Sequence, residues 1–196
     1  MMLPEVTMKQ PKVRIPKQKL LTYADYAQLT PPDSGNYELH NGQIIYMPSP
    51  IPLHQRLSMR LTNRLFNHIE QHKLGELFTA PIDTVFTPND TMQPDILFLK
   101  NDRLHLIGDK KIDGAPDLVV EILSPSNSPK EMGYKKLVYE FSGVREYWIV
   151  NLHKKTLTQY ENVEGEFHSR RVFQQTDTLT SLVIEGFETP MNALFE

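Results

Sequence analysis

The chain contains no cysteine among its 196 residues. Disulfide bonds, thiolate metal sites and cysteine nucleophiles are therefore excluded. Absence of cysteine is typical of the reducing cytosol, so we expect a cytoplasmic protein. The sequence also lacks an apolar run of about 18 residues and an apolar N-terminal leader, so we expect no membrane span and no signal peptide.

The sequence has no excess of basic residues, since 21 Lys and Arg stand against 24 Asp and Glu. The net charge of -3 gives no general signal for nucleic acid, although a local basic patch stays compatible with it. The length suits a single domain, which we assign to residues 20–196. Residues 1–19 lack apolar periodicity, so we expect a flexible N-terminal arm.

Apolar periodicity predicts three helices. Residues 20–29 form a short helix in this prediction, with Thr22 as its N-cap, and residues 129–142 form another that ends at Gly143. The clearest amphipathic helix covers 53–73, because apolar residues recur there every four positions. The recurring residues are Leu53, Leu57, Leu61, Leu65 and Ile69.

Strands are expected between and after these helices. Asn41-Gly42 predicts a tight hairpin, and Glu164-Gly165 predicts a second one. The other predicted strands cover residues 76–87, 94–100, 116–123, 146–152 and, as a short edge strand, 182–184. This order favours a mixed α/β (α+β) domain with one central β-sheet flanked by helices and extended by β-hairpins.

Two acids stand on apolar strands. Asp95 directly follows a proline at the start of one strand, and Glu121 lies late in APDLVVEILSPS. A buried carboxylate is costly unless it is paired or holds a metal ion. If neighbouring strands bring both acids to one end of the sheet, two carboxylates and a main-chain carbonyl would suit Mg²⁺. Such an ion polarises a phosphate and lowers the pKa of a bound water.

A lysine near such acids would position the water and neutralise developing charge. The position two residues after Glu121 holds Leu123, so the lysine has to come from elsewhere. A lysine on the following helix can reach the same point because its side chain is long and flexible. We prefer Lys135 to Lys136, because Lys135 lies four residues from Tyr139 and shares its helix face.

Each of these residues also has an ordinary interpretation. Asp95 could cap a turn, Glu121 could belong to a buried ion pair, and Lys135 could be a solvated helix lysine. Asp117 lies on the strand face of Glu121 but about 13 Å away along the strand, too far to share one ion, so we interpret it as a turn or cap residue.

The long helix carries the candidate substrate contacts. His54 at its start could contact substrate or a carboxylate, or be an ordinary polar helix-end residue. His68 and His72 have a metal-binding spacing, but no third ligand is apparent. A basic stripe on this helix could track a phosphate backbone or simply face solvent, and it consists of Arg56, Arg60 and Arg64.

Several motifs follow one another in a characteristic order: YELHNGQIIYMPSP, the His54 helix, QPDILFL, GAPDLVVEILSPS, the Lys135–Tyr139 helix and SGVREYWIVN. Together they resemble the restriction endonuclease family that was formerly described only as a domain of unknown function, within the PD-(D/E)XK nuclease superfamily. The resemblance covers roughly residues 20–190, and APDLVVEILSPS and GVREYWIV are its most specific parts.

This resemblance implies a restriction-endonuclease-like core and hydrolysis of DNA phosphodiester bonds that depends on Mg²⁺, with Mn²⁺ as a possible substitute. Matched position by position, Asp95 is the acid of the PD motif and Glu121 is the D/E acid. Lys135 matches a lysine displaced onto the following helix, and Glu38 matches an acid that completes the catalytic site. Asp95, Glu121 and the carbonyl of Ile122 are then the expected metal ligands.

Two classes of function follow from the sequence. The first is a metal-dependent DNA endonuclease, for which cleavage of a duplex would suit a two-fold symmetric homodimer. The second is a catalytically inactive module on the same fold that binds nucleic acid or a protein partner. Leu123 and the negative net charge favour the second class. The two classes differ in whether metal-dependent turnover exists.

Overall fold

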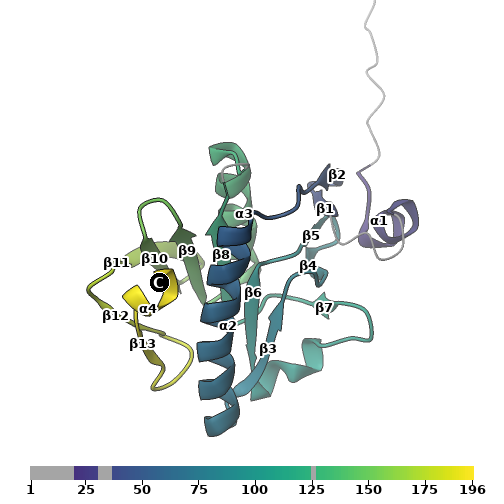
Figure 1. Ribbon diagram of the computed structural model, residues 1–196. Helices are drawn as coiled ribbons and strands as arrows, with labels where there is room; N and C mark the ends of the chain where they lie inside the picture. The colour runs from purple at the N-terminus through teal and green to yellow at the C-terminus, as the bar shows by residue number, and fades with distance from the viewer. Residues whose placement is uncertain (1–19, 31–36, 125–126) are drawn as a thin grey trace, which may run out of the picture.

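The computed structural model describes residues 20–30, 37–124 and 127–196 (Figure 1). The predicted flexible arm at residues 1–19 lies outside these residues. The helices are α1 (Tyr23–Leu29), α2 (Pro52–His72), the 3-10 helix η1 (Asn101–Leu106), α3 (Pro129–Ser142) and α4 (Asn192–Phe195). The predicted boundaries of the three longer helices agree with these within three residues.

The strands of the described residues form three sheets. The largest sheet has the order β11-β10-β9-β8-β6-β3, and the second has the order β2-β1-β5-β4-β7. Two short strands, β12 and β13, pair with each other. The strand bounds are β1 Tyr37–His40, β2 Gln43–Tyr46, β3 Gly75–Thr79, β4 Thr84–Thr87, β5 Asp90–Met92, β6 Ile96–Lys100, β7 Ile112–Asp113, β8 Leu118–Leu123, β9 Glu146–Asn151, β10 Thr156–Val163, β11 Glu166–Phe173, β12 Thr178–Thr180 and β13 Glu188–Pro190.

The six-stranded sheet is the mixed central sheet that the sequence predicts. Strands β8 and β9 run parallel, whereas the other neighbours in the sheet are antiparallel. The β10–β11 hairpin extends one edge (Figure 1). Its turn residues Glu164 and Gly165 have φ of 54° and 90°, and the turn residues Asn41 and Gly42 have 47° and 68°. Both hairpins therefore form at the dipeptides that predicted them.

Helix α2 covers one face of this sheet (Figure 1). The leucine and isoleucine repeat predicted to form its apolar side is buried, except that Leu53 remains 42% exposed near the start of the helix. Alternate residues of β8 form the facing surface, because side chains of a strand point to opposite sides in turn. The residues that meet in this core include Leu57, Leu61, Leu65, Ile69, Leu118, Val120 and Ile122.

Helix α3 covers the opposite face. Its Val138 and Tyr139 pack against Val119 of β8 and Tyr147 of β9. Glu121 therefore points toward α3, because it shares the strand face of Val119. The helix begins after an N-cap serine and ends at Gly143, whose φ of 87° suits a residue without a Cβ atom.

The second sheet holds the N-terminal part of the domain. Helix α1 begins with a reciprocal capping box between Thr22 and Asp25, as the predicted N-cap requires. Tyr26 of this helix donates a hydrogen bond from its hydroxyl to the carbonyl of Tyr37, 2.8 Å away. These contacts attach α1 to β1, which carries Glu38.

Two strand predictions were wrong. The continuous strand expected over 76–87 is divided at Pro81 into β3 and β4, which belong to different sheets, because proline offers no N–H to a ladder. The edge strand expected at 182–184 is not a strand. The N–H groups of Leu182 and Val183 donate instead to the carboxylate of Glu146, at 2.9 Å and 3.0 Å.

No membrane span was expected from the sequence. Helix α2 is the longest of these at 21 residues, but it is strongly amphipathic rather than apolar. Among the described helices, none combines the length and the apolar character needed to cross a membrane.

Candidate active site

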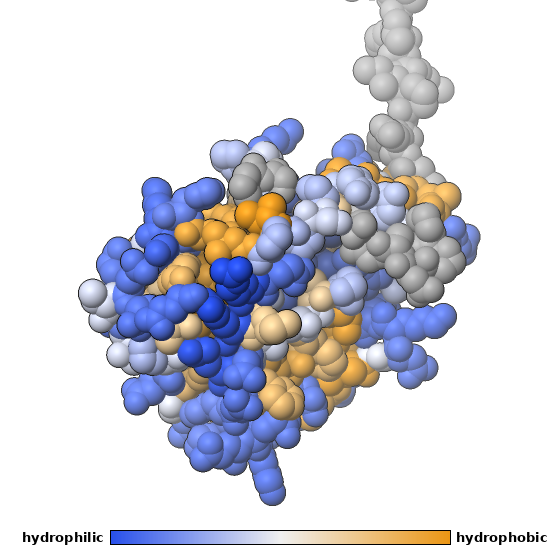
Figure 2. All heavy atoms as spheres, viewed as in Figure 1, coloured by the Kyte–Doolittle hydropathy of each residue, from blue (hydrophilic) through white to orange (hydrophobic). Residues whose placement is uncertain are grey.

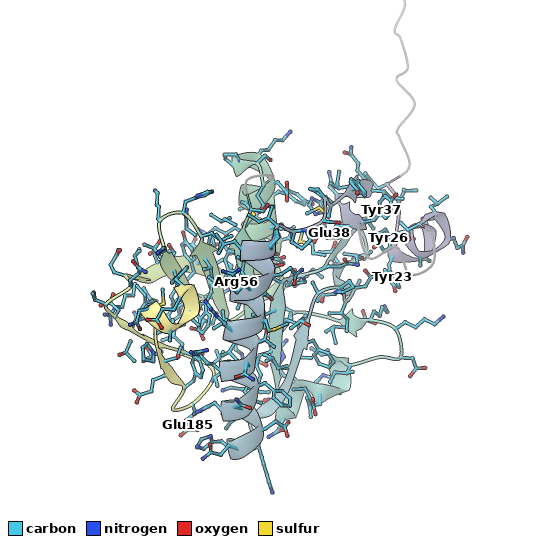
Figure 3. The ribbon with its side chains drawn as sticks, in the orientation of Figure 1. Tyr23, Tyr26, Tyr37, Glu38, Arg56 and Glu185 are labelled. Atoms are coloured by element: carbon cyan, nitrogen blue, oxygen red, sulfur yellow. The ribbon has the colours of Figure 1, made fainter. Side chains whose placement is uncertain are left out.

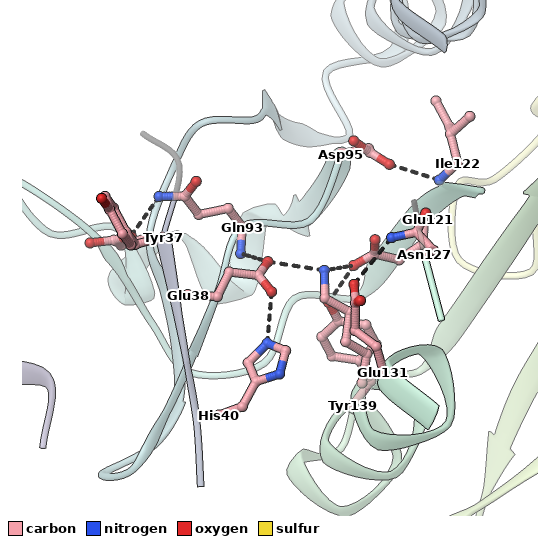
Figure 4. A network of polar contacts seen from close by, with 12 residues as sticks. Tyr37, Glu38, His40, Gln93, Asp95, Glu121, Ile122, Asn127, Glu131 and Tyr139 are labelled. Atoms are coloured by element: carbon pink, nitrogen blue, oxygen red, sulfur yellow. Dashed lines mark hydrogen bonds and ion pairs between the residues drawn. The ribbon is translucent and has the colours of Figure 1, made fainter. Parts of the chain in front are cut away.

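Three elements bring predicted site residues into direct contact (Figure 4). Lys135 of α3 lies with its Nζ 2.9 Å from Glu38 Oε1 and 3.0 Å from Glu121 Oε1. Glu38 comes from β1 of the second sheet, whereas Glu121 comes from β8 of the main sheet. All three side chains are almost fully buried, with relative exposures of 1% to 5%. The lysine therefore joins two carboxylates that are 83 positions apart in the chain.

Helix geometry explains how α3 delivers this lysine. Lys135 and Tyr139 lie one turn apart on the same face, as their spacing predicts. The Tyr139 hydroxyl donates a hydrogen bond to Glu121 Oε1 over 2.5 Å, the same oxygen that faces Lys135. Tyr139 was not among the predicted site residues, although its spacing from Lys135 was the signal that could have indicated it.

Asp95 lies beside this cluster at the start of β6. Its Oδ2 accepts a hydrogen bond from the backbone N–H of Ile122, 2.7 Å away, and lies 3.2 Å from His54 Nε2. Strands β6 and β8 are antiparallel neighbours, so Asp95 and Glu121 meet near one end of the shared ladder. Ile122 contacts Asp95 through its N–H; the expected metal contact through its carbonyl stays a prediction.

Glu38 is held by contacts on both of its oxygens. Oε1 accepts the backbone N–H of Gln93 over 2.8 Å, and Oε2 lies 2.7 Å from His40 Nε2. The Gln93 side chain in turn donates to Asp83 over 2.9 Å. Glu38 thus points into the cluster, with its carboxylate fixed from two sides.

Burial and neighbouring charges shift the pKa values of the three buried groups in different directions. Burial and the carboxylates of Asp95 and Glu38 raise the pKa of Glu121 to about 7, against the opposing effect of Lys135. Burial alone would also raise the pKa of Glu38, but Lys135, His40 and the Gln93 N–H lower it to about 2. Burial alone would lower the pKa of Lys135, yet Glu121 and Glu38 raise it, so the amine stays charged.

Glu38 and Glu121 share the cation Lys135, and the charge of Asp95 acts on Glu121 from nearby. Carboxylate oxygens are the donors that hard divalent cations prefer, and Mg²⁺ commonly uses one or two of them and keeps several waters. Asp95 and Glu121 supply such a pair, so the donor chemistry fits a divalent cation. In the part of the chain that the structure describes, no group of three or more His, Asp or Glu side chains is arranged to hold a metal ion.

The histidine at the start of α2 contacts a carboxylate, which was one of its two expected roles. His54 is buried, and its Nδ1 has no hydrogen-bond partner among the described residues. Burial alone would lower the pKa of His54, but the hydrogen bond and charge of Asp95 raise it. His54 therefore orients Asp95 through this hydrogen bond.

The predicted basic stripe runs along α2 away from this site. Figure 2 shows strongly hydrophilic side chains along the helix, and Figure 3 shows Arg56 among them. Arg56 is exposed, whereas Arg60 donates a hydrogen bond to the carbonyl of Leu194 over 3.4 Å. A role for these residues in substrate binding stays a prediction.

Other polar residues of interest have structural partners. Asp117, interpreted as a turn or cap residue, is fully buried, pairs with Arg145 over 2.9 Å and accepts the N–H of Lys100. His68 and His72 contact the backbone carbonyls of Glu185 and His68, respectively, each over 2.8 Å.

Comparison with known proteins places the chain in a family. The model of the Uma2 family, described as "Putative restriction endonuclease", matches residues 23–192. The chain therefore belongs to this family, as its motifs predict. The comparison with curated proteins gave no match.

A solved structure shares the fold. A protein from Anabaena variabilis, described as "a putative nuclease belonging to DUF820", superimposes with a TM-score of 0.75 and 19% sequence identity. The match covers 89% of this chain and 97% of that chain. The restriction-endonuclease-like fold class expected from the sequence is thus confirmed, and such nuclease families generally use divalent metal ions.

Proposed function

We propose that this protein is a Mg²⁺-dependent DNA endonuclease whose active site consists of Glu38, Asp95, Glu121 and Lys135. The observation that carries this proposal is the 3.0 Å contact between Lys135 Nζ and Glu121 Oε1. Position 123 holds leucine, yet α3 supplies a charged lysine to the acid of β8. In this proposal, Lys135 takes the role of the lysine that position 123 lacks.

Asp95 and Glu121 would hold the metal ion, with the main-chain carbonyl of Ile122 as a further ligand. Mn²⁺, which also accepts oxygen ligands, would substitute for it. Bound there, Mg²⁺ would supply Lewis-acid polarisation of the scissile phosphate and a bound water of lowered pKa. Burial, together with the charges of Asp95 and Glu38, raises the pKa of Glu121 to about 7, and a bound cation would favour the ionised carboxylate.

The other residues of the cluster position these groups. Lys135 stays protonated because two carboxylates raise its pKa, so it supplies positive charge to the phosphate and does not act as the base. Glu38 fixes Lys135 Nζ from the side opposite Glu121, and Tyr139 holds the oxygen Oε1 of Glu121. His54 fixes the orientation of Asp95.

Substrate contacts outside this cluster belong to the same proposal. Arg56 and Arg60 lie on the helix that begins beside Asp95, so their side chains would neutralise phosphates that flank the cleaved bond. Cleavage of both strands of a duplex would suit a homodimer. The cytoplasm, where DNA and Mg²⁺ are both available, is the proposed location.

Nicking of a supercoiled plasmid tests this proposal. Wild-type protein should relax the plasmid in Mg²⁺ or Mn²⁺ and not in EDTA, and Glu121→Ala should abolish relaxation while circular dichroism shows an intact fold. An unchanged rate in Glu121→Ala would refute the assignment of the site. A non-catalytic binding module would give no turnover at any Mg²⁺ or Mn²⁺ concentration.

A further inference from the structure

An open groove of about 600 Å³ lies on the α3 face of the main sheet. Strands β9, β10 and β11 form most of its floor, so we name it the β9–β11 groove. Helix α3 borders it, since Lys136 of this helix places its ammonium 4.2 Å from the centre of the Tyr160 ring, and Tyr160 lines the groove.

The groove begins next to the proposed active site. Ile149, which lines the groove, is the direct β9 neighbour of Glu121 in the ladder. Leu123, which also lines it, follows Glu121 by two residues on the same strand face, about 7 Å along β8. A chain bound with one phosphate at Glu121 would therefore run into this groove within one or two residues of the polymer.

The floor of the groove is apolar and partly aromatic. Leu123, Ile149 and Val172 supply aliphatic surface, and Tyr160 supplies a ring. Val172 is 46% exposed, so its side chain is open to a ligand in the groove. Apolar side chains of this kind can pack on the flat face of an unstacked base.

The remaining lining is neutral hydrogen-bonding groups and one cation. Asn151 and Thr158 supply donors and acceptors of the kind that bind base edges. Lys154 lies at the rim of the groove, where the Asn151 side chain accepts its backbone N–H over 2.9 Å. Among the described residues that line the groove, none is acidic. This charge balance suits a phosphate-linked ligand and disfavours a basic peptide.

We propose that the β9–β11 groove binds an unpaired nucleotide next to the phosphate that is cleaved. This inference rests on the proposed nuclease function and adds the class of its substrate, DNA with single-stranded nucleotides beside the cleaved bond. In an intact duplex the base faces are stacked on one another, so only an unpaired base can place its face on the apolar floor.

Binding of labelled oligodeoxynucleotides tests the groove separately from catalysis. Fluorescence anisotropy in EDTA compares a single strand with its duplex, for wild type, Thr158→Trp, Thr158→Val and Lys154→Gln. Thr158→Trp fills the groove and should weaken binding of the single strand about tenfold, roughly the effect of losing one stacked base. Thr158→Val keeps the shape and should leave that affinity within about twofold.

Lys154→Gln has a matched control in the neighbouring Lys155→Gln, which removes the same charge from the same turn without lining the groove. Lys154→Gln should lower the slope of log affinity against log salt for single strands by about 0.7, the value for one lost phosphate contact. Lys155→Gln should leave the slope unchanged. Equal slopes in the two variants would overturn the assignment of Lys154.

Cleavage assays with the same variants separate the two proposals. We expect Glu121-dependent cleavage of a duplex with an unpaired segment to exceed that of the intact duplex, and Thr158→Trp to remove this preference. Suppose that cleavage depends on Glu121 but shows no preference for the unpaired segment, and that Thr158→Trp cleaves as wild type does. This result would overturn the proposed role of the groove but not the proposed nuclease function. Absence of both DNA binding and cleavage would overturn both proposals.

Discussion

Two buried glutamates on neighbouring parallel strands show how differently this fold treats the same side chain. Glu121 of β8 and Glu146 of β9 are both almost fully buried, and burial raises the pKa of each. Glu146 is surrounded by neutral donors only. Its oxygens accept hydrogen bonds from Trp148 Nε1, Gln159 Nε2, the Ser181 hydroxyl and the N–H groups of Leu182 and Val183.

Glu121 is instead surrounded by charges. Lys135 contacts it, and the carboxylates of Asp95 and Glu38 act on it from other elements. A carboxylate in a complete shell of neutral donors needs no cation, whereas Glu121 shares the cation Lys135 with Glu38 and also experiences the charge of Asp95. The comparison indicates a structural role for Glu146 and is in line with the ligand-binding role that we propose for Glu121.

The largest effect is expected for Lys135→Met. This substitution leaves two buried carboxylates without their cation and should lower the free energy of unfolding by about 3–5 kcal/mol at pH 8. Cleavage should fall by about 10²–10³-fold, because a positioned positive charge is lost. Urea unfolding and plasmid nicking measure the two effects. The exposed Lys130→Met on the same helix is the control and should change stability by less than about 0.5 kcal/mol.

Glu146→Ala should lower stability and leave activity intact, whereas a substitution at Glu121 should abolish activity and leave the fold intact. Five donors lose their acceptor, so the free energy of unfolding should fall by about 3 kcal/mol, as measured by urea denaturation. The specific activity of the protein that remains folded should stay within about twofold of wild type. The reason is that no donor of Glu146 contacts the proposed active-site residues Glu38, Asp95, Glu121 and Lys135. Loss of activity in fully folded Glu146→Ala would contradict the purely structural role that separates Glu146 from Glu121.

His54→Phe tests whether Asp95 needs the contact from His54 for its proposed role. It removes the contact to Asp95 Oδ2 while it fills a similar volume, and cleavage or metal affinity should fall by about 10–100-fold, as for other residues that orient a metal ligand. His54→Gln, which can keep the hydrogen bond, should recover part of the loss. His68→Phe on the same helix is the control. Equal activity of all three variants would show that Asp95 needs no orientation.

The last prediction concerns stability in acid. The folded protein holds the pKa of Glu38 at about 2, below its ordinary value of 4.5. Ionised Glu38 therefore contributes stability above pH 4.5, and this contribution is lost as the pH falls toward 2. Glu38→Gln has no such titration, so its stability should fall less steeply between pH 4.5 and 2. If the free energy of unfolding, measured with urea, depends on pH in the same way for wild type and Glu38→Gln, the lowered pKa of Glu38 is contradicted.

Much of this arrangement could be predicted from the sequence. The alternation in LVVEIL gave the strand faces, and the spacing of Lys135 and Tyr139 gave their common helix face. The family motifs pointed to Glu38, Asp95 and Glu121. These predictions rest on local periodicity and on motifs, which a single sequence contains.

Long-range partners could not be predicted in this way. Glu146 looks like a polar strand start in the sequence, and its partners lie up to 37 positions away. The same contacts explain why the strand expected at 182–184 does not form. The β9–β11 groove likewise depends on how four strands lie side by side, which no local pattern encodes.

Metal binding by calorimetry tests the central claim most directly. Mg²⁺ and Mn²⁺ are titrated into wild type, Glu121→Gln and Glu146→Gln, each first confirmed to be folded by circular dichroism. We predict that wild type and Glu146→Gln bind the metal and that Glu121→Gln loses affinity by at least about tenfold. Equal binding by Glu121→Gln, or no binding by wild type, would contradict the claim that the Glu121 cluster is prepared for a divalent cation.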